Sequence, residues 1–419
     1  MLDRTQAPKA YLLDDLSLAD VKIYHLDNEI KIHVFADDTN PVVKADFIFP
    51  TGKRNEAISG IGTICGKLLT EATSSYSSDV LQETLDHYGA HLDVVVDYDD
   101  TNVSLLCLKE HSSILLPLVK SIITEPLFDQ KEYEKIKYQL SQRIKINNGK
   151  NNVLATKAIR SQLLAGSPYG QFASEESISK ISLEDIKAYF QQNLTMAPQI
   201  VIAGQVDDAL LAELNNQFGI LSFANRKKAG EFQLKSSYKP TVIKRAGSVQ
   251  ASIRLGTLSI GKSHPDYYKL AIANEILGGY FGSRLMKNIR EDKGYTYGIY
   301  SSISNYQAVN YHVIGADVQL ENVDDAISEC KKELLSMQTD LVSDHELATV
   351  KNYMLGNLAS HLDNIFSQAD NYKSKLVEGI DYKEYFTAYV ESIRGISSNE
   401  ILTISKKYFS QEYAEVKVV

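Results

Sequence analysis

The sequence predicts an α+β protein of two tandem homologous domains, each a mainly antiparallel sheet with helices packed on one face. Three observations support this prediction. Segments 178–194 and 393–409 resemble each other, strand-like and helix-like segments follow in the same order in each half, and a polar stretch separates the halves. A chain of 419 residues is also too long for one ordinary core. We therefore expect domains at 1–225 and 241–419, joined by a linker at 226–240.

The repeated segment predicts the same helix and strand in both halves. Ser182 and Ser397 each precede a helical pattern of apolar residues, where an N-cap serine would lie. Each copy then continues into a β-rich stretch, at 199–203 and at 414–419. Each half is therefore expected to contain a strand pair, two helices, a second strand pair, a run of helices and a last strand.

The first half opens with two strand-like segments and an amphipathic helix. Residues 30–35 and 42–49 have the composition of strands. In the segment 60–73, apolar residues recur at positions 61, 64, 65, 68 and 69, which is the spacing of one helix face. The other face carries Thr63, Gly66 and Lys67.

The most specific segment of the second half covers residues 277–300. Its apolar spacing predicts a short amphipathic helix, Gly294 suits the position after the helix end, and an alternating strand follows. Arg290 is thus expected at the end of a helix and Tyr297 at the start of a strand.

These segments resemble the insulinase and pitrilysin type of metallopeptidase, the inverzincins. The helix at 60–73 is similar to the helix on which that family carries its zinc motif, H-x-x-E-H. Residues 277–300 resemble the family's second-half signature, which is Gly-Gly, then Ser-Arg-Leu, an Arg and a Tyr seven residues later. The resemblance covers about residues 20–419 and implies an insulinase-like fold that forms one half of a clamshell.

By this match, the first half has lost the metal ligands. Thr63 and Lys67 stand where the family has its zinc-binding histidines, Gly66 where it has the glutamate that activates water, and Arg143 where it has the third ligand. Zinc needs neutral imidazoles or carboxylates, whereas an ammonium and a guanidinium repel a dication. We therefore expect no metal or other cofactor on this chain, and zinc in a partner subunit.

The resemblance implies that Arg290 and Tyr297 are catalytic and substrate-binding residues. In the family, such a pair holds the substrate backbone, and both side chains can donate to a peptide carbonyl as it becomes an oxyanion. The implied function is that of a non-zinc-binding subunit of a heteromeric zinc metallopeptidase, inactive alone. It would act with a zinc-bearing homologous subunit on a peptide substrate.

Other interpretations stay open. The chain could be a catalytically inert scaffold or peptide-binding protein of the same fold, and a homodimer is possible in isolation. Arg290 could make an ordinary surface salt bridge, with Tyr297 an aromatic residue at a rim. Independent catalysis has no visible pairing of nucleophile and base to support it.

Composition excludes several classes of protein. A net charge of −9 with scattered Lys and Arg argues against nucleic-acid binding. No stretch approaches the roughly 20 consecutive apolar residues of a membrane helix, so we expect no membrane insertion and a cytoplasmic location, or a periplasmic one if a leader was removed.

Cys65, Cys107 and Cys330 each lie in an apolar segment and are expected to be buried thiols. His87 and His91 are four residues apart, but Gly89 between them separates their faces.

Overall fold

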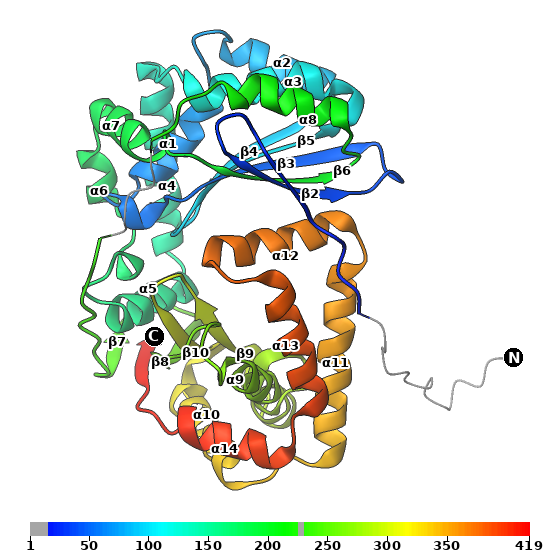
Figure 1. The fold of residues 1–419 in the computed structure, drawn as a ribbon. Helices are drawn as coiled ribbons and strands as arrows, with labels where there is room; N and C mark the ends of the chain where they lie inside the picture. The colour runs from blue at the N-terminus through cyan, green and yellow to red at the C-terminus, as the bar shows by residue number, and fades with distance from the viewer. Residues whose placement is uncertain (1–15, 225–229) are drawn as a thin grey trace, which may run out of the picture.

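Two β-sheets, each covered by helices, organise the residues that the computed structural model describes, which are 16–224 and 230–419 (Figure 1). The predicted α+β class is confirmed. Of the predicted linker, residues 226–229 lie outside the described residues, as do residues 1–15 and 225 of the predicted first domain.

The first sheet contains six strands in the order β1-β2-β6-β3-β5-β4. The strands are β1 (Lys22–His25), β2 (Lys31–Ala36), β3 (Val42–Phe49), β4 (His91–Val96), β5 (Thr101–Leu108) and β6 (Gln199–Gly204). Neighbouring strands run antiparallel except β2 and β6, which are parallel. The sheet is therefore largely antiparallel, as predicted.

The helices of the first half pack mainly on one face of this sheet. They are α1 (Ile61–Leu69), α2 (Ser78–His87), α3 (Ser112–Thr124), α4 (Gln130–Asn148), α5 (Asn151–Leu163), α6 (Glu175–Lys180), α7 (Leu183–Asn193) and α8 (Asp208–Leu214). Short 3-10 turns lie at η1 (Lys53–Asn55), η2 (Lys109–His111) and η3 (Pro168–Gly170), and a π-helical turn at η4 (Asn215–Gly219).

The second sheet contains five strands in the order β7-β11-β8-β10-β9. They are β7 (Thr241–Ile243), β8 (Gln250–Leu258), β9 (Thr296–Asn305), β10 (Asn310–Gln319) and β11 (Ala414–Val418). The helices of this half are α9 (Tyr267–Asn274), α10 (Val323–Thr339), α11 (Asp344–Leu362), α12 (Ile365–Glu378), α13 (Tyr382–Gly395) and α14 (Ser398–Tyr408). Two π-helical turns, η5 (Glu275–Gly279) and η6 (Met286–Asp292), connect α9 to β9, and the 3-10 turn η7 (Leu320–Asn322) precedes α10.

The predicted duplication is visible in matching helix caps. The Ser182 hydroxyl accepts a hydrogen bond from the Asp185 amide at 3.2 Å, and the Ser397 hydroxyl accepts one from the Glu400 amide at 3.3 Å. Both serines belong to a capping box that satisfies backbone donors left free at a helix start. α7 leads to β6 and α14 leads to β11, as the repeat predicts.

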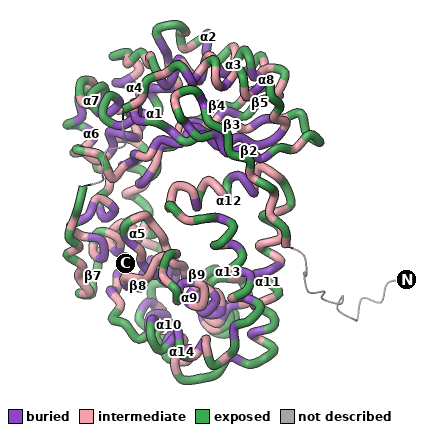
Figure 2. The backbone as a smooth tube through the Cα atoms, in the orientation of Figure 1, coloured by how far each residue is buried: buried purple, intermediate pink, exposed green. Residues whose placement is uncertain are grey.

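The two halves exchange one helix each. α5, from the first half, packs on β8 and β11 of the second sheet, and α12, from the second half, packs on β2 and β6 of the first sheet (Figure 1). Each exchanged helix covers the face opposite to the one that its host's own helices cover. On β6, for example, Ile200 and Ile202 join the core of the first half, whereas Val201 and Ala203 join the cluster formed with α12. In Figure 2 the buried residues accordingly follow the strands of the first sheet, directly above α12.

Polar contacts also tie the halves together. Lys373 of α12 lies 3.1 Å from the buried Asp46 carboxylate on β3. The Asp99 carboxylate accepts hydrogen bonds from the Tyr169 hydroxyl at 2.5 Å and from the Gln307 amide at 3.0 Å. The described part of the predicted linker runs along the end of α5, where the Lys235 amide donates to the Ala165 carbonyl at 2.7 Å. The halves therefore form one packed unit.

The three cysteines are buried thiols, as predicted. Burial raises the pKa of the Cys107 thiol to about 11 and that of Cys330 to about 12, and it also raises the pKa of Cys65. Within the described ranges, no helix combines the length and the apolar character that crossing a bilayer requires.

Candidate functional site

The residues that the resemblance matches to zinc-site positions lie on α1 and α4 of the first half. Thr63, Gly66 and Lys67 are on α1, with Lys67 exposed in its last turn, and Arg143 is exposed on α4. Gly66 packs tightly against β4, because a Cβ atom there would lie 2.9 Å from Val96 Cγ2. The space that a glutamate would need on α1 is therefore filled by β4 side chains.

The start of α1 is capped by an internal carboxylate. Glu56 Oε2 and Oε1 accept hydrogen bonds from the amides of Gly60 and Gly62, both at 2.9 Å. These are amides that a helix N-terminus leaves without intrahelical partners. Burial raises the pKa of Glu56, and the bond from Gly60 partly opposes that rise. Glu56 also lines a pocket of about 180 Å³ together with Thr63 and Tyr98, so the carboxylate that shares this pocket with Thr63 already holds the start of the helix.

These positions do not fit a zinc ion. They offer a hydroxyl, a bare backbone, an ammonium and a guanidinium, whereas zinc sites use imidazole, thiolate and carboxylate. In residues 16–224 and 230–419, no group of three or more His, Cys, Asp or Glu side chains is arranged to hold a metal ion. His87 ends α2 and His91 begins β4, so the two do not share a helix face.

In the second half, η6 and β9 position the predicted pair. η6 buries Met286 and Ile289, and Gly294 follows it with φ of +67°, a left-handed conformation that glycine adopts without a Cβ clash. Arg290 lies in the last turn of η6, and Tyr297 is the second residue of β9. The predicted local structure is therefore present, with a π-helical turn in place of the expected α-helix.

A wide cleft lies beside this turn. Its volume is about 780 Å³, and it is lined by residues of β8, β9, β10, η5 and α11, including Tyr280, Phe281, Tyr297, Tyr300 and Tyr353. Tyr297 is 91% exposed and Phe281 is 64% exposed. Aromatic side chains that stand free at a cleft in this way can cover an apolar surface of a ligand.

Arg290 contacts this cleft through Phe281. The Arg290 guanidinium lies 4.4 Å from the centre of the Phe281 ring. Among the residues that the structure describes, the Arg290 side chain has no acidic partner and no hydrogen bond. The alternative interpretation of Arg290 as a surface salt bridge therefore finds no support in the described ion pairs. Tyr297 likewise has no described hydrogen bond. Both side chains are free to donate.

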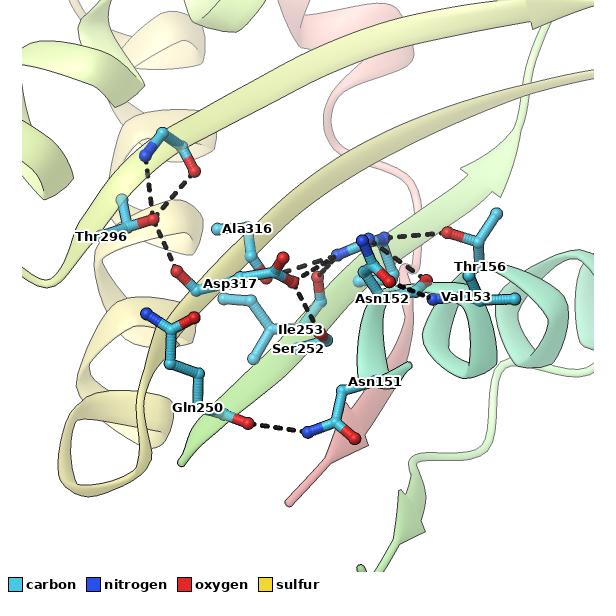
Figure 3. A network of polar contacts seen from close by, with 12 residues as sticks. Asn151, Asn152, Val153, Thr156, Gln250, Ser252, Ile253, Thr296, Ala316 and Asp317 are labelled. Carbon is cyan, nitrogen blue, oxygen red and sulfur yellow. Dashed lines mark hydrogen bonds and ion pairs between the residues drawn. The ribbon is translucent and has the colours of Figure 1, made fainter. Parts of the chain in front are cut away.

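A buried cation at the cleft, Arg254, did not stand out in the sequence. Arg254 on β8 is 5% exposed, donates to the Ile253 carbonyl at 2.8 Å and lies 3.9 Å from the Asp317 carboxylate. Figure 3 shows the surrounding polar network, in which the start of α5 also takes part through Asn152 and Thr156. An arginine at an inward position of an apolar strand is the signal that could have pointed to it.

The two sheets, each covered by helices, and the matching turns of the two halves fit the two-domain architecture of the metallopeptidases that the sequence resembles. Comparison with known proteins identifies the family. The model described as "Insulinase (Peptidase family M16)" matches residues 32–173, and the model described as "Peptidase M16 inactive domain" matches residues 180–354. The chain belongs to the insulinase family of peptidases, M16.

Relatives in this family carry different names. The chain is 24% identical to the "uncharacterized zinc protease YmxG" of Bacillus subtilis, over 94% of this chain and 97% of that protein. It is 25% identical to the "non-peptidase homolog YmxG" of Helicobacter pylori, over 79% and 78%. It is also 21% identical to subunit 1 of the bovine mitochondrial cytochrome b-c1 complex, over 63% and 56%.

A solved structure shares the whole architecture. The peptidase M16 inactive domain from Pseudomonas fluorescens superposes with a TM-score of 0.85 at 20% identity, covering 95% of this chain and 98% of that one. At this identity, the likeness shows the fold alone.

Proposed function

We propose that this chain is the non-zinc-binding subunit of a heteromeric zinc metallopeptidase, in which Arg290 and Tyr297 hold the substrate backbone. One observation carries the proposal. Two hydrogen-bond donors without an internal side-chain partner stand beside a cleft of about 780 Å³, and one of them is 91% exposed. The loss of metal donors at Thr63, Gly66, Lys67 and Arg143 supports the division of labour between two subunits.

The chain's own residues would contribute binding and charge stabilisation. The zinc-bearing partner would supply the metal and the water that it activates. The Arg290 guanidinium and the Tyr297 phenol would donate hydrogen bonds to the substrate carbonyl, whose oxygen gains negative charge as water attacks. Phe281 keeps the guanidinium beside the cleft, since a cation is attracted to the face of an aromatic ring.

A second candidate function is a catalytically inert scaffold or peptide-binding protein. The similarity to a subunit of the bovine cytochrome b-c1 complex favours it, as does the name of the Helicobacter pylori relative. The two candidates differ in one respect. A clamp subunit raises the turnover of a zinc-bearing partner, whereas a scaffold does not.

The test is a reconstitution with a zinc-bearing homologous subunit from the same source. We expect cleavage of a quenched fluorescent peptide only in the mixture, and a loss of about a hundredfold to a thousandfold with Arg290→Ala or Tyr297→Phe. Tyr138→Phe is the matched control, because Tyr138 is 67% exposed on α4, away from the cleft. Unchanged turnover by the Arg290→Ala, Tyr297→Phe double variant would contradict the proposed role of these two residues in holding the substrate. Cleavage by this chain alone would contradict the proposed need for a zinc-bearing partner.

A further inference from the structure

A second cavity lies inside the helical part of the second half. It has a volume of about 220 Å³ and is enclosed by α11, α12, α13 and the start of η5. Part of its wall is aromatic, formed by Tyr353, Tyr382, Tyr385, Phe386 and Tyr389, and Met354, Leu358 and Leu362 add aliphatic surface. Tyr353 lines the larger cleft as well, so the two spaces are neighbours. A small apolar group fits such a wall.

Glu275 brings an unpaired carboxylate to this cavity. It is the first residue of η5, and in the described part of the chain its carboxylate has no ion-pair partner and no hydrogen bond. The carboxylate lies against Gly279, where a Cβ atom would come within 2.4 Å of Glu275 Oε2. Burial raises the pKa of Glu275 to about 6, as expected for a carboxylate that no cation compensates.

Lys375 brings an ammonium to the same cavity. It lies on α12, is 9% exposed, and its Nζ atom is 4.9 Å from the centre of the Tyr385 ring. Its described hydrogen bond goes to the neutral Ser374 hydroxyl at 3.5 Å. The carboxylate of Glu378 forms an ion pair with Lys262, and it acts on Lys375 only as a neighbouring charge, because no described acidic side chain lies within ion-pair distance of Lys375. Burial, with the charge of Lys262 next in importance, lowers the pKa of Lys375 to about 8.

A partly buried charge without an ion-pair partner is costly, and here two such charges of opposite sign, Glu275 and Lys375, line one small cavity. A ligand that carries both an ammonium and a carboxylate on an apolar body would compensate the two charges together. We propose that this cavity binds a small zwitterion, an α-amino acid or a dipeptide with an apolar side chain. Glu275 receives its ammonium, Lys375 its carboxylate, and the tyrosine and phenylalanine rings its side chain.

This site goes beyond the proposed peptidase role and does not depend on it. The binding would be a property of this chain without any partner, and it involves neither Arg290 nor Tyr297. A failed reconstitution of peptidase activity would therefore leave the proposal standing, and the absence of zwitterion binding would leave the clamp standing.

The experiment is isothermal titration calorimetry on the full chain with four related ligands. L-phenylalanine carries both charges, N-acetyl-L-phenylalanine lacks the ammonium, L-phenylalanine amide lacks the carboxylate, and the dipeptide Leu-Phe separates the two charges by one more residue. We expect phenylalanine or the dipeptide to bind at least tenfold more tightly than either blocked ligand, since a charge-assisted hydrogen bond typically contributes about ten- to a hundredfold in affinity. Which of the two zwitterions binds more tightly identifies the natural class.

Variants then match each charge to its ligand group. Glu275→Gln should weaken the binding of phenylalanine by about ten- to a hundredfold and leave the binding of N-acetyl-L-phenylalanine, which lacks the ammonium, unaffected. Lys375→Met should weaken the binding of phenylalanine by the same factor and leave the binding of L-phenylalanine amide, which lacks the carboxylate, unaffected. Glu391→Gln and Lys383→Met are controls on the exposed surface of α13. Lack of saturable binding of any zwitterion would overturn the proposal, as would equal effects of the variants on matched and blocked ligands. If Lys375→Met does not fold, the ranking of the four ligands by the parent chain decides alone.

Discussion

Each half contains a turn in which a left-handed glycine links a helix to a strand, from α2 to β4 in the first half and from η6 to β9 in the second. The side chains around the two turns differ in polarity. Gly89 has φ of +58° and Gly294 has φ of +67°, and each links a helix to a strand. The Ala90 amide donates to the Leu85 carbonyl at 2.9 Å, five residues back, whereas the Tyr295 amide donates to the Ile289 carbonyl at 3.0 Å, six residues back, after the wider π-helical turn. The left-handed glycine is thus retained in both copies, although the last turn of the helix differs.

The side chains at equivalent positions differ in kind. Leu85 is 7% exposed and belongs to the core of the first half, whereas Arg290 is only partly buried and stacks on Phe281 beside the cleft. Leu92 packs against the first core, whereas Tyr297 is 91% exposed. The repeated fold needs the glycine but does not need a donor at either position, which supports a role for Arg290 and Tyr297 outside folding.

The largest expected contrast concerns turnover. In the reconstituted mixture, Arg290→Ala should lower kcat/KM by about a hundredfold to a thousandfold, since it would remove the donor to the oxyanion that we propose. Leu85→Ala should leave kcat/KM per folded molecule unchanged, because Leu85 faces a core. Steady-state kinetics normalised to the folded fraction measures both. A comparable loss for the two variants would break the comparison.

The stability of the same variants should show the reverse order. Leu85→Ala should lower the free energy of unfolding by about 2 to 5 kcal/mol, because it leaves a cavity in a packed core. Arg290→Ala should change it by less than about 0.5 kcal/mol, since no described residue forms an ion pair with Arg290. Urea denaturation followed by circular dichroism gives both values. A large loss for Arg290→Ala would favour a structural role.

Local patterns predicted much of the fold. Ser182 and Ser397 cap their helices, Gly294 follows the end of η6, and strands are present at the segments predicted at 30–35 and 42–49. These features could be predicted because helix caps, turns and strand alternation depend on residues that are neighbours in the sequence. The exchange of α5 and α12 was not predicted, since an amphipathic pattern does not specify which sheet a helix will cover.

The candidate site was predicted in part. The positions of Arg290 and Tyr297 at the end of a helix and the start of a strand followed from spacing, but their roles rest on family resemblance and stay predictions. Arg254, Glu275 and Lys375 were missed because each looks like an ordinary charged residue in its own segment. Only the packing of distant elements makes them buried or unpaired.

A smaller contrast concerns one histidine in each sheet. His33 on β2 and His312 on β10 are both buried at 3% exposure. Burial lowers the pKa of His33 to about 4 and that of His312 to about 3, from 6.5. Because the pKa in the folded state lies below the pKa in the unfolded state, burial of the neutral imidazole costs no proton above pH 6.5, and its contribution to the free energy of unfolding is fully present there. This contribution is lost as the pH falls from 6.5 toward 4.

Replacing either histidine should therefore flatten the dependence of unfolding free energy on pH. For His33→Gln and His312→Gln we expect the loss of stability across that window to shrink by on the order of 2 kcal/mol each. Urea titrations at several pH values compare the slopes, which are independent of any constant cost of the substitution. Unaltered slopes would mean that these imidazoles are not protonated on unfolding.

The smallest expected effect tests the shared turn itself. Gly89→Ala and Gly294→Ala should each cost about 1 kcal/mol, because an alanine is strained at positive φ although no atom lies within 4 Å of the new Cβ. Gly356→Ala in α11 is the control and should stabilise by up to about 1 kcal/mol, since alanine favours a helix. Thermal melts compare the three. Unequal costs at positions 89 and 294 would show that the two turns are not equivalent.

The reciprocal placement of α5 and α12 bears on how this molecule could move. Cutting the chain between its halves would strip each sheet of one covering helix and leave Val201 and Ala203, or Val416 and Val418, open to water. Each half thus covers apolar surface of the other, and a hinge motion between the halves would expose that surface. If the chain acts in the proposed two-subunit peptidase, a peptide would then enter by separation of whole subunits, and this chain would move as one rigid body.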